Sequence, residues 1–112
     1  MVLVQDFYVG PMRERHGLDV RVPRADERAE VHRIIYEELC RGIVGFESKA
    51  KYLAIVERAV QAGADSVIFG CTEIGLLVGP QDFSVPAFDS TALHAEAGLD
   101  FALGRPTTRA AA

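Results

Sequence analysis

The chain has 112 residues, of which 49% are hydrophobic and 25% charged, and its formal net charge is -4. This length holds one ordinary domain with one hydrophobic core, and the composition is that of a folded globular protein. No apolar run approaches the roughly 20 residues that span a bilayer, which excludes a membrane-spanning helix, and a negative charge does not favour nucleic acid as a partner.

Two further features concern the compartment. Asp6 interrupts the apolar start of the chain, which also lacks a basic n-region, so the start does not resemble a signal peptide. The two cysteines, Cys40 and Cys71, are too few for a disulfide scaffold. We therefore expect a cytoplasmic protein with free thiols.

The first 23 residues predict a helix and then a strand. Residues 5–16 favour a helix although Pro11 lies within it, and Gly17 is a plausible C-terminal stop. The segment Leu18–Val22 alternates apolar and polar residues, which is the period of a strand, and Pro23 ends it.

Two longer helices follow. Asp26 is a good N-cap for the first and Ser48 for the second, and Gly63 closes the second helix. Both helices carry apolar residues at three- and four-residue spacings, which predicts a buried face. These faces consist of Val31, Ile34, Ile35, Leu39 and Ile43 in the first helix, and of Leu53, Val56 and Val60 in the second.

The second half of the chain predicts two strands, each followed by a helix. Val67–Phe69 is a short, continuous apolar run, as in a strand covered on both faces, and Thr72–Leu77 follows it as a short helix. Val85–Phe88 is the next strand. A last helix runs to Leu103. Its cap is Asp89, Ser90 or Thr91, and its apolar side carries Leu93, Ala97 and Phe101.

This alternation predicts an α/β fold, a three-layer domain in which parallel strands are joined by crossover helices. Residues 1–104 form the domain and residues 105–112 a flexible tail. Three strands are evident. A parallel α/β unit normally opens with a strand, whereas this chain begins with a helix, so we expect that the opening strand is missing.

The first candidate site is the Gly70-Cys71-Thr72-Glu73 turn, because ligands of open α/β sheets bind at the carboxyl ends of strands. The positive end of a helix dipole would lower the pKa of Cys71 towards neutrality, which suits an acid/base. Thr72 and the first backbone N–H groups of the helix could bind a carboxylate. Glu73 would either orient its neighbours or repel anions. The alternative is an inert, buried Cys71.

The second strand end carries Asp89, Ser90, Thr91 and then His94. Capping alone would explain Asp89, whereas His94 is expected at the same edge as Cys71. The other histidines are predicted to lie on the surface, and Cys40, inside a helix, is predicted to have no role. The histidines and cysteines do not have the spacing of a metal site, and no glycine-rich phosphate loop occurs.

Two stretches resemble the C-terminal half of the aspartate/glutamate racemase family. Gly63–Leu77 contains Gly-Cys-Thr-Glu, and Val85–His94 contains Asp-Ser-Thr-x-x-His. The segments Val31–Gly42 and Gln5–Tyr8 also resemble that family, so the similarity runs from about Gln5 to Leu103. Glutamate racemases usually have His after the Cys-Thr pair, so Glu73 favours the aspartate branch.

The resemblance implies a cofactor-independent racemase with two similar α/β lobes that hold a small amino acid between them. Each lobe supplies one acid/base, usually cysteine. Cys71 matches the catalytic cysteine of the second lobe, and Thr72 the residue that contacts a substrate carboxylate. Arg41 lies near the place of a basic residue for that carboxylate, although Ile43 is an alternative at this position. The implied substrate-binding residues are Arg41, Thr72, Glu73, Asp89, Thr91 and His94.

The first lobe of that family, and the strand with a Gly-Thr turn that opens the second lobe, have no counterpart in the sequence. We therefore expect a portion of an enzyme that works with a missing N-terminal lobe or as a homo-oligomer. Two alternatives stay open. One is a hydantoin racemase or a single-cysteine decarboxylase of the same superfamily. The other is a non-catalytic, self-associating domain.

Overall fold

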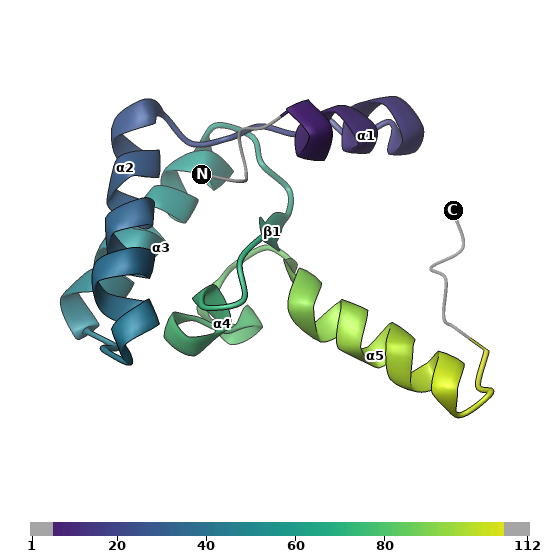
Figure 1. Ribbon diagram of the computed structural model, residues 1–112. Helices are drawn as coiled ribbons and strands as arrows, with labels where there is room; N and C mark the ends of the chain where they lie inside the picture. Colours follow the sequence, from purple (N-terminus) through teal and green to yellow (C-terminus); the bar gives the residue numbers. More distant parts are fainter. Residues whose placement is uncertain (1–5, 107–112) are drawn as a thin grey trace.

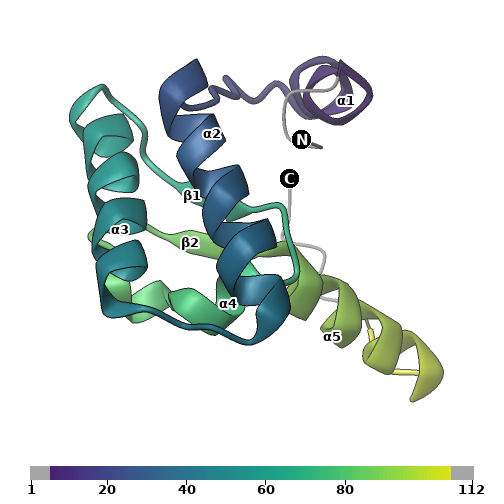
Figure 2. The same cartoon turned by 60° about the vertical axis from the view of Figure 1, so that its left-hand side comes forward.

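The computed structural model describes residues 6–106. In chain order the elements are α1 (Asp6–His16), α2 (Ala25–Arg33), the π-helical turn η2 (Ile34–Glu38), the 3-10 turn η3 (Leu39–Arg41), α3 (Phe46–Gln61), β1 (Val67–Phe69), α4 (Ile74–Leu77), the 3-10 turn η4 (Pro80–Asp82), β2 (Ala87–Asp89) and α5 (Ser90–Ala102). Figures 1 and 2 show α2 and α3 side by side with the strands behind them, while α1 and α5 extend away from this body. The predicted helix start at Gln5 and the tail from residue 107 lie outside the described residues.

The two strands form a parallel sheet, which confirms the predicted α/β class. Val67 is opposite Ala87, and Phe69 is opposite Asp89. The other predicted strand, Leu18–Val22, is wrong, because this segment is irregular. Alternation alone does not make a strand without a neighbouring strand to pair with. No strand of the described residues pairs with this segment, and the carbonyl oxygen of its Val20 accepts instead from the Arg13 side chain at 2.6 Å.

The core lies between the α2–η2 helix, α3, β1 and α4. Four residues of the first predicted apolar face are buried there, and Val56 of the second is buried as well. Leu53 and Val60 are partly buried. The core consists of Val31, Ile34, Ile35, Leu39, Tyr52, Ile55, Val56, Phe69, Ile74, Leu77 and Val78. Ile43 is half exposed, contrary to the prediction, because the chain turns away at Gly42, which has a φ of 76°.

The ends of the helices were predicted with mixed success. Gly17, with a φ of 64°, ends α1 as predicted, and its N–H donates to Arg13 O at 3.1 Å. The predicted N-caps Asp26 and Ser48 are wrong, because both lie inside the first turn of their helices. The Ser48 hydroxyl donates instead to the carboxylate of Glu38 in η2.

The last helix begins as predicted and then leaves the body. Asp89 caps α5, since its Oδ1 accepts from the N–H groups of Thr91 and Ala92 at 2.9 and 3.2 Å. The apolar side of α5 is nevertheless not buried: Leu93 is 51% exposed and Phe101 is 84% exposed. Figure 1 shows the reason, because α5 extends away from the other elements without another helix alongside it. Within residues 6–106, every helix is too short or too polar to cross a bilayer.

Candidate active site

The carboxyl ends of the two strands form one edge, and a hydrogen bond ties them together. Phe69, the last residue of β1, is opposite Asp89, the last residue of β2. Ser90 Oγ donates to the carbonyl oxygen of Phe69 at 2.7 Å. The turn that carries Cys71 therefore starts beside the first turn of α5.

Cys71 lies in the turn between β1 and α4, half-buried against the core. Its Sγ is 2.7 Å from Glu73 Oε2, to which the thiol donates. Burial raises the pKa of the Cys71 thiol, and so does this hydrogen bond. The predicted lowering of this pKa is wrong, because α4 has only four residues and a carboxylate faces the sulfur. The resting form of Cys71 is a neutral thiol.

Glu73 is the partner that keeps the thiol protonated. Hydrogen bonds from the Cys71 thiol and then from the Thr72 hydroxyl hold the pKa of the Glu73 carboxyl below its usual value. A charged carboxylate thus accepts from a protonated thiol. Of the two roles considered for Glu73, this contact favours orienting its neighbours, because its charge is directed at Cys71 and Thr72.

Asp89 joins this edge from β2. Its Oδ1 caps α5, and its Oδ2 lies 3.0 Å from the position that a Cβ on Gly75 would take. A side chain at Gly75 would thus press on this carboxylate, so the glycine lets Asp89 approach the first turn of α4. Asp89 therefore connects α5 to the helix that follows Cys71.

The remaining predicted residues are exposed. Thr91 and His94 lie on α5, and within residues 6–106 no hydrogen bond joins either side chain to Cys71, Glu73 or Asp89. Arg41 is exposed at the end of η3, which packs against α4. Cys40 precedes it, is also exposed, and is close enough that its charge raises the pKa of Cys71 further. Sequence reasoning dismissed Cys40. Gly42, a turn signal directly after Arg41, could have indicated that the chain folds back at this point.

Two open hollows occur away from this edge. One, of about 390 Å³, lies between α3 and residues 82–84, and the other, of about 300 Å³, lies between α2 and α3. Neither is lined by Cys71, Glu73 or Asp89. Among residues 6–106, no three His, Cys, Asp or Glu side chains are grouped so that they could hold a metal ion. The Cys71 edge therefore lies outside both of these hollows.

Comparison with known proteins gives two kinds of match. A model of the Asp/Glu/hydantoin racemase family matches residues 4–98. Among solved structures, a candidate Asp/Glu racemase from Yersinia pestis is similar with a TM-score of 0.84 and 48% identity. An aspartate racemase homologue from Pyrococcus horikoshii OT3 is similar with a TM-score of 0.79 and 35% identity. Each match covers 90% of this chain and 44% of the other, so the chain spans less than half the length of these proteins.

Proposed function

The chain belongs to the Asp/Glu/hydantoin racemase family, and on that premise we propose that it forms one side of the active site of a cofactor-independent aspartate or glutamate racemase. The observation that carries this proposal is the 2.7 Å contact between Cys71 Sγ and Glu73 Oε2 at the carboxyl end of a parallel strand. A thiol beside a charged carboxylate can both hold and release a proton, and strand ends are where α/β folds bind ligands.

Cys71 acts as the proton donor in one direction of this reaction. A raised pKa keeps its proton in place at neutral pH, so the thiol can transfer that proton to the α-carbon of a substrate carbanion. The S–H bond breaks, a Cα–H bond forms, and a thiolate remains. In the other direction the thiolate removes the α-proton. Glu73 affects both steps, because its negative charge destabilises the thiolate and so makes the thiolate a stronger base.

The substrate's carboxylate groups would bind around this thiol. Thr72 supplies a hydroxyl next to Cys71, and Arg41, exposed on the turn that packs against α4, supplies a positive charge. Asp89 is engaged with the first turn of α5, so its part is to hold the edge together. Thr91 and His94, exposed on the same helix, would contact the substrate from above this edge.

Exchange on both faces of an α-carbon needs an acid and a base on opposite sides. Cys71 can serve one face. We propose that the second group, and the wall that encloses the substrate, come from another α/β lobe, either a separate lobe or a second copy of this chain. The position of Cys71 outside both hollows and the greater length of the matched structures support this.

A deuterium experiment tests the proposal. The full chain, alone and together with a first lobe taken from a relative, is incubated with aspartate or glutamate in heavy water, and deuterium at Cα is followed by NMR. We expect exchange that Cys71→Ser abolishes and Cys40→Ser leaves intact. If neither preparation exchanges deuterium, or if Cys71→Ser exchanges as fast as the unmodified chain, the proposal fails.

One observation also favours a single-cysteine decarboxylase of the same superfamily. Removing carbon dioxide and adding one proton needs one thiol, which Cys71 supplies at the end of β1. A hydantoin racemase stays the other member of this alternative. Incubation with an arylmalonate and with a substituted hydantoin separates these reactions from amino-acid exchange. Release of carbon dioxide dependent on Cys71, without deuterium exchange into aspartate or glutamate, would favour the decarboxylase.

The exposed apolar side of α5 favours a self-associating role as the other candidate. Leu93, Leu99 and Phe101 are all more than half exposed. Exposed apolar surface of this kind promotes association. Sedimentation of the full chain tests it: a monomer at all concentrations would exclude self-association as the function.

A further inference from the structure

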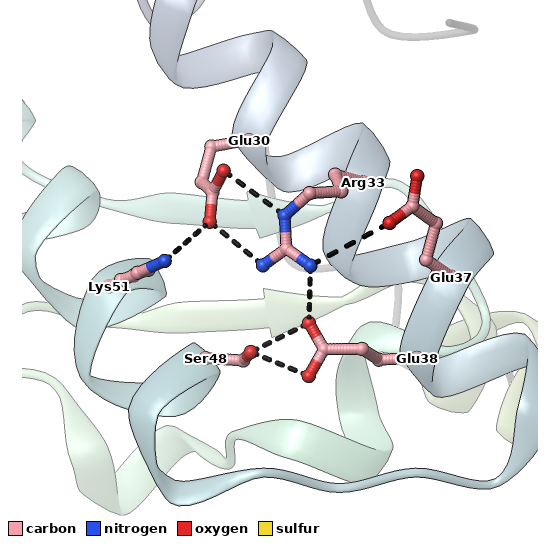
Figure 3. A network of polar contacts seen from close by, with 6 residues as sticks. All are labelled: Glu30, Arg33, Glu37, Glu38, Ser48 and Lys51. Carbon is pink, nitrogen blue, oxygen red and sulfur yellow. Dashed lines mark hydrogen bonds and ion pairs between the residues drawn. The ribbon is translucent and has the colours of Figure 1, made fainter.

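The turn beside Cys71 is held by a polar network that the proposed chemistry does not use (Figure 3). The Arg33 guanidinium lies between two carboxylates, with Nη2 2.9 Å from Glu30 Oε1 and Nη1 3.0 Å from Glu38 Oε2. Lys51 reaches Glu30 from α3 at 3.1 Å. The network therefore ties the end of α2 and the following η2 to α3.

Glu38 belongs to this network and also has an unusual backbone conformation. Its carboxylate accepts from Ser48 Oγ, 2.7 Å from each oxygen, and Ser48 is only 5% exposed. The backbone of Glu38 leaves the helical region, with φ -120° and ψ -69°. Its carbonyl oxygen accepts from the N–H of Ile43 at 2.9 Å. Both the side chain and the carbonyl group of Glu38 are therefore held in place.

The turn that follows Glu38 lies against the helix that follows Cys71. The π-helical turn Ile34–Glu38 ends there, and such turns often occur where a helix must redirect side chains for function. The next turn, η3, packs against α4, with Leu39 and Ile74 buried in one core. Cys40 and Arg41 are carried on this turn. Glu38 is thus the fixed residue directly before the turn that carries Cys40 and Arg41.

We propose that Glu38, held by Ser48 and Arg33, is a positioning residue that sets residues 39–43 against α4 as one wall of the Cys71 site. The importance of this wall for substrate rests on the proposed function, in which Cys71 is the reacting group. The packing of Leu39–Arg41 against α4 does not, because it is a contact within the chain.

Alkylation of Cys71 tests the wall without any substrate. The full chain and the variants Glu38→Gln and Ser48→Ala are treated with iodoacetamide, and modification of Cys71 is followed by peptide mass spectrometry. Loss of a partly buried, charge-assisted hydrogen bond should loosen the wall, and we expect Cys71 to react roughly ten-fold faster in both variants. Glu37→Gln is the matched control, because this neighbouring carboxylate is 65% exposed and stays 3.9 Å from Arg33.

Hydrogen exchange separates positioning from general destabilisation. We expect faster exchange within residues 38–44 of both variants and unchanged exchange in β1. The proposal is overturned if both variants react like Glu37→Gln, or if exchange rises equally in β1 and α3. Aspartate, added as a probe, should slow alkylation of the unmodified chain, and a higher concentration should be needed with Glu38→Gln. If aspartate protects Cys71 neither in the chain alone nor in the chain combined with a first lobe from a relative, the proposed function fails, while the alkylation rates without aspartate still decide the role of Glu38.

Discussion

Ser90 Oγ donates to the carbonyl oxygen of Phe69 at 2.7 Å and so joins the end of β1 to the start of α5. Because the two strands have only three residues each, this bond is a large part of what fixes their shared edge. We expect Ser90→Ala to lower the free energy of unfolding by about 1 kcal/mol, the usual cost of one such bond. Chemical denaturation measures it. Ser84→Ala, at an exposed serine, should stay within error of the unmodified chain.

The charge of Glu73 should control the ionisation of Cys71. Replacing Glu73 by Gln removes the negative charge beside the sulfur, so the thiolate becomes less unfavourable and the pKa of Cys71 falls. The ultraviolet absorbance of the thiolate, recorded against pH in a Cys40→Ser background, reports this pKa directly.

Glu47→Gln, at an exposed position in the first turn of α3, is the matched control and should leave the titration of Cys71 where it is. An unchanged or raised pKa of Cys71 in Glu73→Gln would show that Glu73 does not set the protonation state of the thiol.

Two glycines in helices should respond to alanine in opposite ways. A Cβ at Gly75 would lie 3.0 Å from Asp89 Oδ2, and the capping bonds of Asp89 limit how far this carboxylate can retreat. Overpacking should outweigh the better helix propensity of alanine, for a net loss of about 1 kcal/mol in the free energy of unfolding. At Gly98 no atom lies within 4 Å, so Gly98→Ala should stabilise α5 by about 0.5 kcal/mol.

Thermal unfolding of both glycine variants, followed by circular dichroism, checks this pair. A more stable Gly75→Ala would mean that Asp89 does not press on the first turn of α4. The difference between the two variants removes the general effect of alanine, which they share.

Local patterns were sufficient to predict part of this molecule. The strand at Val67–Phe69, the buried face of α2 and the cap at Asp89 each depend on neighbouring residues, and all three were predicted from the sequence. The expected cover on both faces of that strand is wrong, because Ile68 is 38% exposed. The missed features depend on side chains that meet across the fold. Ser48 caps nothing because Glu38, ten residues earlier, takes its hydroxyl. The irregular segment 18–22 has a strand's alternation but no strand to pair with.

The same difference between local patterns and contacts across the fold explains which features of the candidate site were predicted. The motif around Cys71 located the site at a strand end, because strand ends and helix starts are local signals. The pKa shift of Cys71 was predicted in the wrong direction, because it depends on where the Glu73 side chain points and on how short α4 is. The proximity of Cys40 to this edge depends on η3 packing against α4, which no local pattern encodes.

The ion-pair network around Arg33 should make the free energy of unfolding depend on pH. Hydrogen bonds from Arg33 and then Lys51 lower the pKa of Glu30 from 4.5 to about 2. A carboxyl whose pKa is lower in the folded chain stabilises the fold above its unfolded pKa, and this contribution disappears as pH falls through the folded value. The free energy of unfolding should therefore decrease between about pH 4.5 and pH 2. In Glu30→Gln this part of the decrease should be absent, whereas Glu47→Gln should retain it.

The apolar side of α5 supplies the last prediction. Phe101 is 84% exposed, so replacing it with Ser removes little buried contact within residues 6–106. Surface substitutions of this kind usually change the free energy of unfolding by less than about 0.5 kcal/mol. If α5 mediates association with another lobe or copy, Phe101→Ser should lower the sedimentation coefficient at high concentration while the thermal midpoint of the dilute protein stays the same. Thr91→Ser, a polar exchange at the other end of the helix, should change neither quantity. A large loss of stability in dilute Phe101→Ser would instead mean that this helix packs against the rest of the chain.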